Sequence, residues 1–398
     1  MSAPRASVDP LTGLEAARAA VYVHFPYCLS KCPYCDFASI AARVVPQERY
    51  AKAVLAELSL RWPEGRGVDA VYFGGGTPSL WDAAHVKAVL QRIASLGALA
   101  PDAEVTLEAN PGASDEARFA AYRAAGVNRL SIGVQSLDEG TLKALGRAHA
   151  PGDVERAVKA ARAAGFENLS LDLIYGVQGQ TLAQARADAQ AVVALGAEHL
   201  SAYALTLDKE SLAEEVPLAR ALSRGEVVLP PDEEVTAMRQ EVEAVFAWAG
   251  LRRYEVSNYA KPGYHSRHNA AYWTGGEYLA VGAGATGYRK DGAGGVRWSN
   301  HRSADKYLAA VEAGRLPEGD RETLGAEDLA AERIAMGLRL VNGVQLEGAL
   351  AQHGVAAGER TEEVARLVKG GLLELRDGRL ALTARGFEVH SAVAARLM

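Results

Sequence analysis

The sequence predicts an α/β protein: a partial (β/α)6 barrel, followed by an added α+β region and a C-terminal winged-helix-like domain. Two observations predict this class. Strand-like and helix-like segments alternate regularly in the first half of the chain, and unusual residues cluster where the strand-like segments end. The first observation indicates a parallel sheet, and the second favours a barrel.

Six short apolar runs carry the strand signal, at residues 21–25, 70–73, 104–108, 129–134, 169–174 and 200–205. Ala-rich stretches with helical apolar spacing fall between or after them, at residues 48–62, 83–96, 114–125, 137–145, 151–164 and 182–195. Consecutive strand–helix units imply a parallel sheet with right-handed crossovers. An open doubly wound sheet and a barrel both fit this alternation.

The ends of the runs favour the barrel. Cysteine, glycine and polar residues gather there, at residues 28–35, residues 74–78, Glu108 with Asn110, Gln135, and Asp172 with Gly176. In a barrel all of these ends point to one face, where active sites lie. Six units are fewer than a closed barrel needs, so we expect a partial barrel that is open on one side.

The remaining segments suggest four parts: a mobile tail at 1–20, the barrel at 21–230, a barrel extension at 231–320 and the C-terminal domain at 321–398. The extension begins with a helix at 233–249, becomes loop-rich and aromatic, and has a Gly-rich break at 291–295. The C-terminal domain has helical stretches at 327–340, 346–352 and 361–369. Two short strands follow at 372–375 and 379–382, joined by Asp377-Gly378, a strong hairpin signal.

Composition narrows the compartment and the partners. The chain has 398 residues, is 49% hydrophobic and carries a net charge of -6. This acidic balance argues against nucleic acid as a partner, because such surfaces are basic. No apolar run is long enough to span a membrane, which leaves peripheral membrane contact open. The first twenty residues lack the apolar core of a signal peptide, so we expect a cytoplasmic protein.

The three cysteines of the chain all lie within eight residues, in the pattern Cys28-x3-Cys32-x2-Cys35. This is no disulfide framework, and metal ligation or redox chemistry explains it better. Three thiolates can bind three corners of a [4Fe-4S] cluster and leave the fourth iron open to S-adenosylmethionine. The alternative is a zinc site, for which His24 and Asp36 are the local candidates, without the usual spacing. A redox pair would leave one cysteine unexplained.

Other residues at the strand ends are candidates for ligand contact. Gly74-Gly75-Gly76-Thr77-Pro78 is either a tight turn or a backbone that approaches a ligand closely. Four polar residues at or just beyond the strand ends are further candidates: Glu108, Gln135, Arg147 and Asp172. A carboxylate can accept hydrogen bonds from ribose hydroxyl groups, and an arginine can pair with a carboxylate. By contrast, residues 282–287 match G-x-G-x-x-G but no strand–helix unit follows them, so we reject a dinucleotide site there.

With these residues considered, the chain resembles the radical SAM coproporphyrinogen III oxidase-like family. The matching segments are residues 22–37, 74–79, 108–112, 131–136, 145–149 and 172–176. The resemblance implies that Cys28, Cys32 and Cys35 bind the cluster. It implies that the bound S-adenosylmethionine contacts Tyr22, Tyr34, Gly75 and Glu108. In the oxidase a second such molecule contacts the positions that match Gly76, Thr77, Gln135, Arg147 and Asp172.

Three features point to the heme chaperone-like branch of this family instead of the oxidase. The oxidase has a fourth cysteine where this chain has Phe37, and it has a substantial N-terminal extension. The segment His268-Asn269-x-x-Tyr272-Trp273 matches a motif that is associated with heme in proteins of this branch. An imidazole can ligate iron, and aromatic rings can cover a porphyrin. His265 is a competing ligand, and the alternative is a structural aromatic corner with His268 bonded to backbone.

The resemblance therefore implies a heme chaperone that binds heme, a [4Fe-4S] cluster and S-adenosylmethionine, and that passes heme to an acceptor protein. The alternative is oxygen-independent coproporphyrinogen III oxidation, or another radical reaction on a tetrapyrrole. Whether the chain is an enzyme stays open at this point. A regulator that uses the winged helix on DNA is a weaker option, because the wing at 376–379 is short and of mixed charge.

Overall fold

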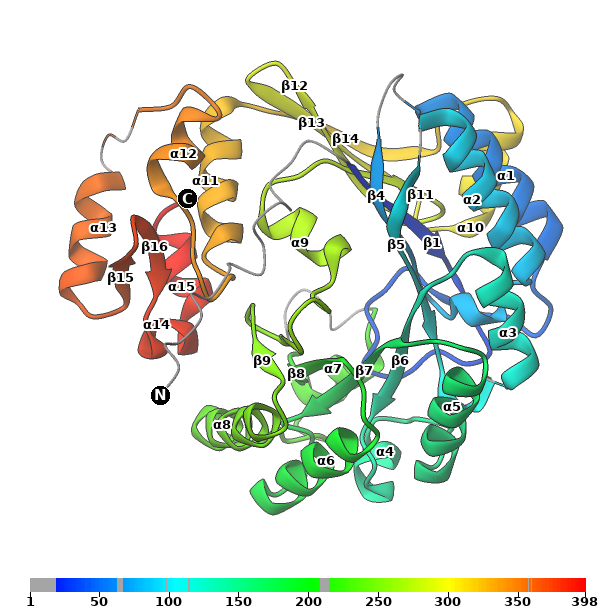
Figure 1. The fold of residues 1–398 in the computed structure, drawn as a ribbon, viewed down its shortest axis with the longest axis horizontal. Coiled ribbons are helices and arrows are strands. Elements are labelled where there is room, and N and C mark those ends of the chain that lie inside the picture. Colours follow the sequence, from blue (N-terminus) through cyan, green and yellow to red (C-terminus); the bar gives the residue numbers. More distant parts are fainter. Residues whose placement is uncertain are drawn as a thin grey trace, which may run out of the picture.

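The computed structural model describes residues 19–62, 67–97, 99–113, 115–207, 215–356, 358 and 360–398. Most of the expected tail at 1–20 and residue 114 of the third expected helix lie outside these residues. Within the described part of the chain, one sheet holds twelve strands in the order β14-β13-β12-β11-β1-β4-β5-β6-β7-β8-β10-β9. Figure 1 shows this sheet curving around a central space.

The six expected strands form the middle of the sheet, where neighbouring strands pair in parallel. They are β1 (Ala19–Phe25), β4 (Val68–Gly75), β5 (Leu99–Ala109), β6 (Arg129–Gln135), β7 (Asn168–Tyr175) and β8 (His199–Ala204). Helices cover their outer face, in the order α1 (Gln47–Arg61), α2 (Ala83–Gly97), α3 (Glu116–Ala125), α4 (Glu139–Ala144), α5 (Pro151–Ala163) and α6 (Leu182–Ala194). The partial barrel is confirmed, and its buried core lies between these helices and the sheet.

The region after the barrel extends the sheet on both sides, which the sequence did not predict. On one side, β11 (Tyr278–Val281) pairs in parallel with β1 and is followed by β12 (Thr286–Asp291), β13 (Gly294–Asn300) and β14 (Glu318–Leu324). On the other side, β10 (Asn258–Ala260) pairs antiparallel with β8 and is followed by β9 (Arg252–Arg253). The expected Gly-rich break at 291–295 is therefore wrong, because these residues form the β12–β13 hairpin.

Gly282, the first glycine of the rejected dinucleotide motif, allows β11 to pack closely against β1. A Cβ on Gly282 would lie 2.3 Å from the backbone oxygen of His24, so only glycine fits between β11 and β1. The Gly282 N–H donates to the buried carboxylate of Glu57 (2.9 Å), which also accepts hydrogen bonds from Tyr307 and Arg61. Glu57 on α1 thus anchors the sheet extension to the barrel.

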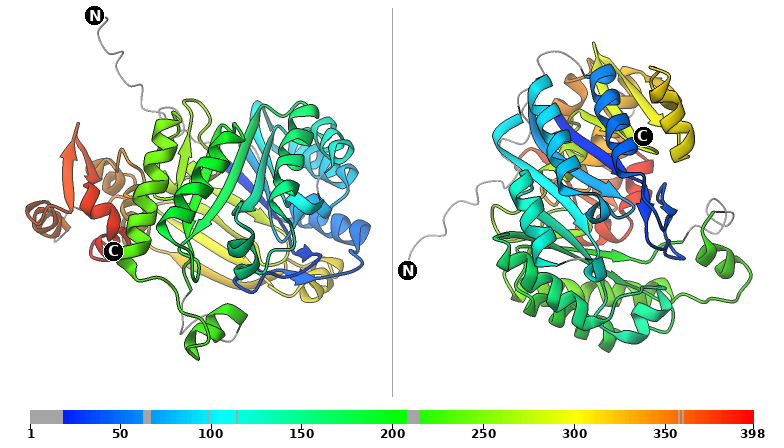
Figure 2. Two further views of the ribbon diagram at one scale, coloured as in Figure 1. Left: turned by 90° about the horizontal axis from the view of Figure 1, so that it is seen from below. Right: turned by 90° about the vertical axis from the view of Figure 1, so that its right-hand side faces the viewer.

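Three further helices follow the six of the barrel wall. α7 (Pro217–Ser223) comes near the end of the barrel region, α8 (Asp232–Trp248) packs on α6, and α10 (Ala304–Glu312) packs on α1. Both views in Figure 2 show α7 standing away from the barrel wall. A hydrogen bond from the Leu218 N–H to the Pro33 carbonyl (2.8 Å) ties α7 to the loop that carries the cysteines.

A separate hydrophobic core holds the C-terminal domain together. The domain consists of α11 (Ala326–Gly337), α12 (Leu346–Ala351), α13 (Arg360–Lys369), the hairpin β15 (Leu373–Arg376) and β16 (Arg379–Leu382), α14 (Ala384–Glu388) and α15 (His390–Ala395). Asp377 (φ 50°) and Gly378 (φ 74°) both adopt the left-handed conformation that a tight hairpin turn requires. The three helices followed by a hairpin match the winged-helix-like expectation.

Candidate functional site

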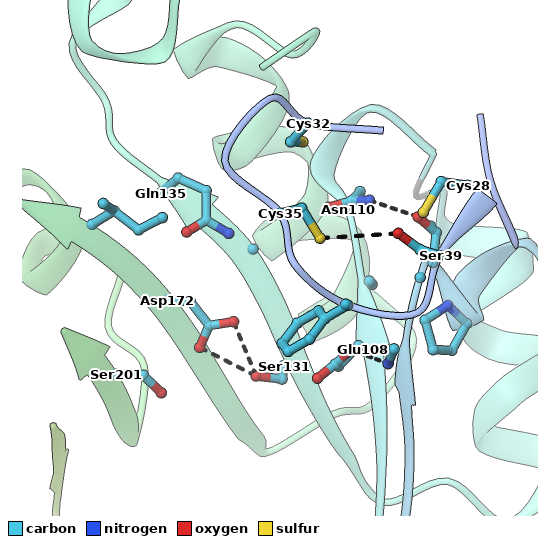
Figure 3. Close-up of a pocket in the computed structure, with 18 of the residues that line it drawn as sticks. Cys28, Cys32, Cys35, Ser39, Glu108, Asn110, Ser131, Gln135, Asp172 and Ser201 are labelled. Carbon is cyan, nitrogen blue, oxygen red and sulfur yellow. Dashed lines mark hydrogen bonds between the residues drawn. The ribbon is translucent and has the colours of Figure 1, made fainter. Parts of the chain in front are cut away.

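A cavity of about 340 Å³ opens at the carboxyl ends of the barrel strands, beside the cysteine loop (Figure 3). It brings together the three cysteines and most of the residues that the sequence singled out. These are Tyr34, Gly75, Gly76, Thr77, Glu108, Gln135, Arg147 and Asp172. The strand ends therefore converge on one site, as the barrel predicts.

Two short parallel strands, β2 (Tyr27–Cys28) and β3 (Ile40–Ala41), close the base of the cysteine loop. Cys28 is buried, Cys32 and Cys35 are partly exposed, and all three are free thiols. Cys35 donates its N–H to the Cys32 carbonyl (3.1 Å), and the Cys35 Sγ lies 3.9 Å from the Ser39 hydroxyl. Burial raises the pKa of the Cys28 and Cys35 thiols, with nearby hydroxyl groups lowering it in part.

The donor set fits an iron–sulfur cluster better than zinc. Among the residues that the structure describes, no three His, Cys, Asp or Glu side chains surround the position of a single ion. A zinc ion needs its ligands about 2.0–2.3 Å from one point, whereas each thiolate of a cubane binds a different iron. The chain has three cysteines, so one corner of such a cluster keeps no cysteine ligand. The three thiols face the cavity that could hold its exogenous ligand.

Gly76 follows β4 and packs against the backbone that leads from β1 into β2 and the cysteine loop. Its N–H donates to the Phe25 carbonyl (2.7 Å), and the N–H of Thr77 donates to the Tyr27 carbonyl (2.9 Å). A Cβ on Gly76 would lie 2.8 Å from the backbone oxygen of Tyr27 and 2.9 Å from that of Phe25. The glycine run is thus both a close backbone approach and part of the cavity wall.

Two partly buried carboxyl groups line the cavity from β5 and β7, on either side of Ser131 on β6 (Figure 3). Glu108 accepts hydrogen bonds from the Tyr72 hydroxyl (2.8 Å) and the Gly75 N–H (3.0 Å), and Asp172 accepts from Ser131 (3.3 Å). Burial raises the pKa of Glu108 to about 7 and that of Asp172 to about 6, with hydrogen bonds opposing the shift. Both groups can accept hydrogen bonds from the hydroxyl groups of a ribose.

Arg147 connects the cysteine loop to the strand ends. Its guanidinium donates to the Cys32 Sγ (3.3 Å), to the Asn110 side-chain oxygen (2.7 Å) and to the Gly133 carbonyl (3.2 Å). Its Nε is buried and has no hydrogen-bond partner among the described residues. Next to it, Gln135 has a φ of 65°, a strained value for a residue other than glycine and one that often marks functional sites.

Tyr22 and the rings of the aromatic motif do not line this cavity, although Asn269 of the same motif does. The Tyr22 hydroxyl bonds the His24 Nδ1 (2.9 Å), and its ring stacks on His268 at 5.9 Å. His268 belongs to α9 (Arg267–Trp273), which packs on β1 and β4 inside the curve of the sheet. Its ring also stacks on Tyr72 at 4.8 Å. Burial lowers the pKa of His268 to about 3, so the imidazole is neutral.

The bonds of the motif differ from those of the structural alternative. The His268 Nε2 bonds the Tyr272 hydroxyl (3.1 Å) and not a backbone group, while its Nδ1 has no partner among the described residues. The guanidinium of Arg339, from the C-terminal domain, lies over the Trp273 ring at 4.3 Å. His265 packs edge-on against the Tyr254 ring at 4.6 Å. The motif thus joins the inside of the barrel to the C-terminal domain.

The sequence reasoning missed a set of inward-facing polar residues deeper in the cavity. They alternate with buried apolar residues along three strands: Arg129 and Ser131, Ser170 before Asp172, and His199 and Ser201. Successive side chains of a strand point to opposite faces, so polar residues at every second position of a buried strand signal an interior lining. This period was readable in the sequence.

The partial barrel with three loop thiols, a glycine-lined cavity and paired carboxyl groups defines a radical SAM protein. Residues 22–192 match the Radical SAM superfamily, whose members carry a [4Fe-4S] cluster and use S-adenosylmethionine, and residues 324–389 match the HemN C-terminal domain. The chain is 39% identical over 384 residues to the heme chaperone HemW of Mycobacterium tuberculosis, covering 95% of this chain and 94% of that protein. The chain belongs to the HemW family.

A further relative and one solved structure are also similar to the chain. The mitochondrial radical S-adenosyl methionine domain-containing protein 1 of Mus musculus is 38% identical over 372 residues, covering 90% of this chain and 83% of that one. The solved coproporphyrinogen III oxidase HemN of Escherichia coli superposes with a TM-score of 0.79 at 21% identity, covering 96% of this chain and 92% of that one. At this identity the HemN structure shows a shared fold only.

Proposed function

We propose that this protein is a heme chaperone, which binds heme and transfers it to an acceptor protein. The observation that carries the proposal is the identity of 39% to a HemW heme chaperone over nearly the full length of both chains. Phe37 supports it, because this exposed side chain stands where the oxidase has its fourth cysteine. The fold alone does not favour the oxidase, since the two activities share it.

We assign the cluster to Cys28, Cys32 and Cys35. Bound there, a [4Fe-4S] cluster would offer its open iron to the amino and carboxylate groups of S-adenosylmethionine. The chain's own residues would shape the site around this ligand. Arg147 holds the cysteine loop to the strand ends and adds positive charge, and Glu108 and Asp172 present hydrogen-bond acceptors to hydroxyl groups.

Of the four contacts predicted for the first S-adenosylmethionine, three line the cavity and one lies behind its wall. Tyr34, Gly75 and Glu108 line the cavity and are proposed as contacts of the first S-adenosylmethionine. Tyr22 lies behind Tyr72, with its hydroxyl bonded to His24, so we propose that it supports the wall and does not touch the ligand as the cavity now stands. The residues for a second molecule border the same cavity: Gly76, Thr77, Gln135, Arg147 and Asp172.

The heme itself we place near the aromatic motif of α9, outside the cluster cavity. Tyr272 and Trp273 offer flat apolar surface, and His268 is the iron ligand that the resemblance implies. The acceptor is a protein of unassigned identity. None of the described helices has both the length and the apolar character that crossing a membrane requires.

Heme binding by the purified full-length protein tests the proposal. Protein with a reconstituted cluster, and protein without one, are titrated with hemin under anaerobic conditions. We expect saturable binding at one heme per chain and transfer of that heme to a heme-free acceptor. Failure of both preparations to bind heme would contradict the proposal. A parallel incubation with coproporphyrinogen III, S-adenosylmethionine and reductant is expected to yield no protoporphyrinogen IX.

A further inference from the structure

A second cavity lies between the aromatic motif, the sheet extension and the C-terminal domain. Its volume is about 220 Å³. Tyr272 borders it from α9, Tyr278 and Tyr288 from β11 and β12, and Arg297 from β13. Helix α11, which packs on both α9 and β13, supplies the opposite wall, and His353 after α12 lies at its edge. We call this space the aromatic pocket.

His353 is prepared to bind a metal at this pocket. Its side chain is 7% exposed, and its Nδ1 lies 3.2 Å from the Ala293 carbonyl at the tip of the β12–β13 hairpin. A carbonyl can only accept, so this nitrogen carries the proton. Its one hydrogen bond within the described part of the chain uses Nδ1, so Nε2 keeps a lone pair. Metal-bound histidines characteristically donate their other nitrogen in this way, which fixes the ring and its tautomer.

His268 is less suited to the same task. Its ring stacks on Tyr22 on one side and Tyr72 on the other, deep inside the curve of the sheet. Its Nε2 already bonds the Tyr272 hydroxyl, and the side chain is buried. An iron ligand at this position would have to leave the aromatic stack and break that hydrogen bond. The geometry favours a supporting role for His268, which holds Tyr272 at the wall of the aromatic pocket.

The rest of the aromatic pocket offers the groups that a porphyrin needs. The three tyrosines provide flat surface, and Arg297 and Arg333 provide positive charge for propionates. Arg297 is paired with Glu322 and with Glu332, which also lines the pocket, and Arg333 donates to the Trp273 carbonyl, so a propionate would compete for these arginines. Two thioethers, on Met336 and Met398, border the space and could serve the opposite face of the iron. Both methionines are exposed, by 40% and 65%, and such unbranched side chains rearrange readily.

The size of the pocket suits a transferable ligand. Its 220 Å³ falls below the roughly 300–1,000 Å³ that enclose a small molecule. A porphyrin would therefore enter with one edge and keep the other in solvent, where an acceptor can reach it. The larger cleft of about 600 Å³ around His390 is a weaker choice, because the His390 Nε2 is bonded to Arg339 (3.4 Å) and Ser391 (3.3 Å).

We propose that His353 is an axial ligand of the heme iron, with the porphyrin seated in the aromatic pocket between α9, the β12–β13 hairpin and α11. This inference rests on the proposed heme chaperone function and assigns its ligand. The motif of α9 then contributes to the wall of the site through Tyr272, and the C-terminal domain contributes the iron ligand.

Hemin titration of full-length variants tests the assignment. In His353→Gly we expect affinity to fall by at least about tenfold, since even losing a partner of a metal-bound histidine costs about 10–100-fold. Free imidazole should enter the vacated space and restore the absorption spectrum of the bound heme. The matched control is His390→Gly, a partly buried histidine of the same domain, which should bind heme as the wild type does. His268→Gly removes the support of Tyr272 and should weaken heme binding, but imidazole should not restore it.

The outcomes separate the two proposals. If wild-type protein binds no heme, the chaperone function itself fails. If wild-type protein binds heme and His353→Gly binds it equally well, the ligand assignment is overturned and the function stands. Recovery by imidazole in His268→Gly or His390→Gly would place the iron at that histidine instead. Should His353→Gly fold poorly, His353→Met keeps a ligand, and we expect it to bind heme with an altered spectrum; an unaltered spectrum would overturn the assignment.

Discussion

The substitution Gly76→Ala tests whether the cluster site depends on the close approach of two backbones. The new Cβ would lie 2.8 Å and 2.9 Å from the backbone oxygens of Tyr27 and Phe25, and neither can move without shifting the backbone that leads into the cysteine loop. Inserting a methyl group into so tight a contact costs about 1–3 kcal/mol. For a barrel of this size that corresponds to a fall of roughly 2–12 °C in the unfolding midpoint, at about 2–4 °C per kcal/mol.

The assay is thermal unfolding of the cluster-free protein, followed by iron and sulfide analysis after reconstitution and by S-adenosylmethionine binding. Gly112→Ala is the matched control, because this glycine also follows a barrel strand but its Cβ would meet only His149, at 3.8 Å. We expect Gly112→Ala to behave as the wild type does and Gly76→Ala to lose stability and ligand binding together. If Gly76→Ala unfolds at the wild-type temperature and binds the nucleotide normally, the reasoning about this wall of the cavity is wrong.

Three further predictions follow from the site and its supports. Cys35→Ser should abolish the cluster, measured as iron and sulfide content, while the far-ultraviolet circular dichroism stays unchanged. Burial raises the pKa of Glu108 from 4.5 to about 7, so between these values the folded state binds a proton that the unfolded state has lost, and the free energy of unfolding falls as the pH rises. In Glu108→Gln this decrease should be smaller when unfolding is measured across the same pH range. An unchanged pH dependence would refute the assignment of the shift to Glu108. Arg61→Ala leaves the buried carboxylate of Glu57 without its ion pair and should cost about 3–5 kcal/mol in denaturant unfolding, against a negligible loss for the exposed pair member Lys52→Ala.

The barrel was predictable because its signals are local. The spacing of apolar residues indicates each strand–helix unit within its own stretch of sequence. The observed bounds of the six strands and helices differ from the expected ones by a few residues. The outer strands were not predictable in the same way. β11 spans four residues and pairs with β1, more than 250 positions earlier, so nothing near Tyr278 in the sequence specifies the partner.

The cluster site was predictable for a related reason. Parallel strands bring their ends together whatever the intervening sequence, so Glu108, Gln135 and Asp172 could be placed on one face from their positions alone. The deeper polar lining, such as Arg129, needed the two-residue period to be read as well. His353 has no local signal, because its role arises from a hairpin tip and a domain that meet only in the folded chain.

The handover of heme tests the central claim most directly. Cluster-reconstituted protein loaded with one equivalent of heme is mixed anaerobically with a heme-free acceptor protein, and the heme on each partner is measured after separation. We expect heme to leave this protein for the acceptor faster than it leaves the same protein diluted into buffer alone. Heme that stays bound, or departs no faster in the presence of the acceptor, would contradict a chaperone function.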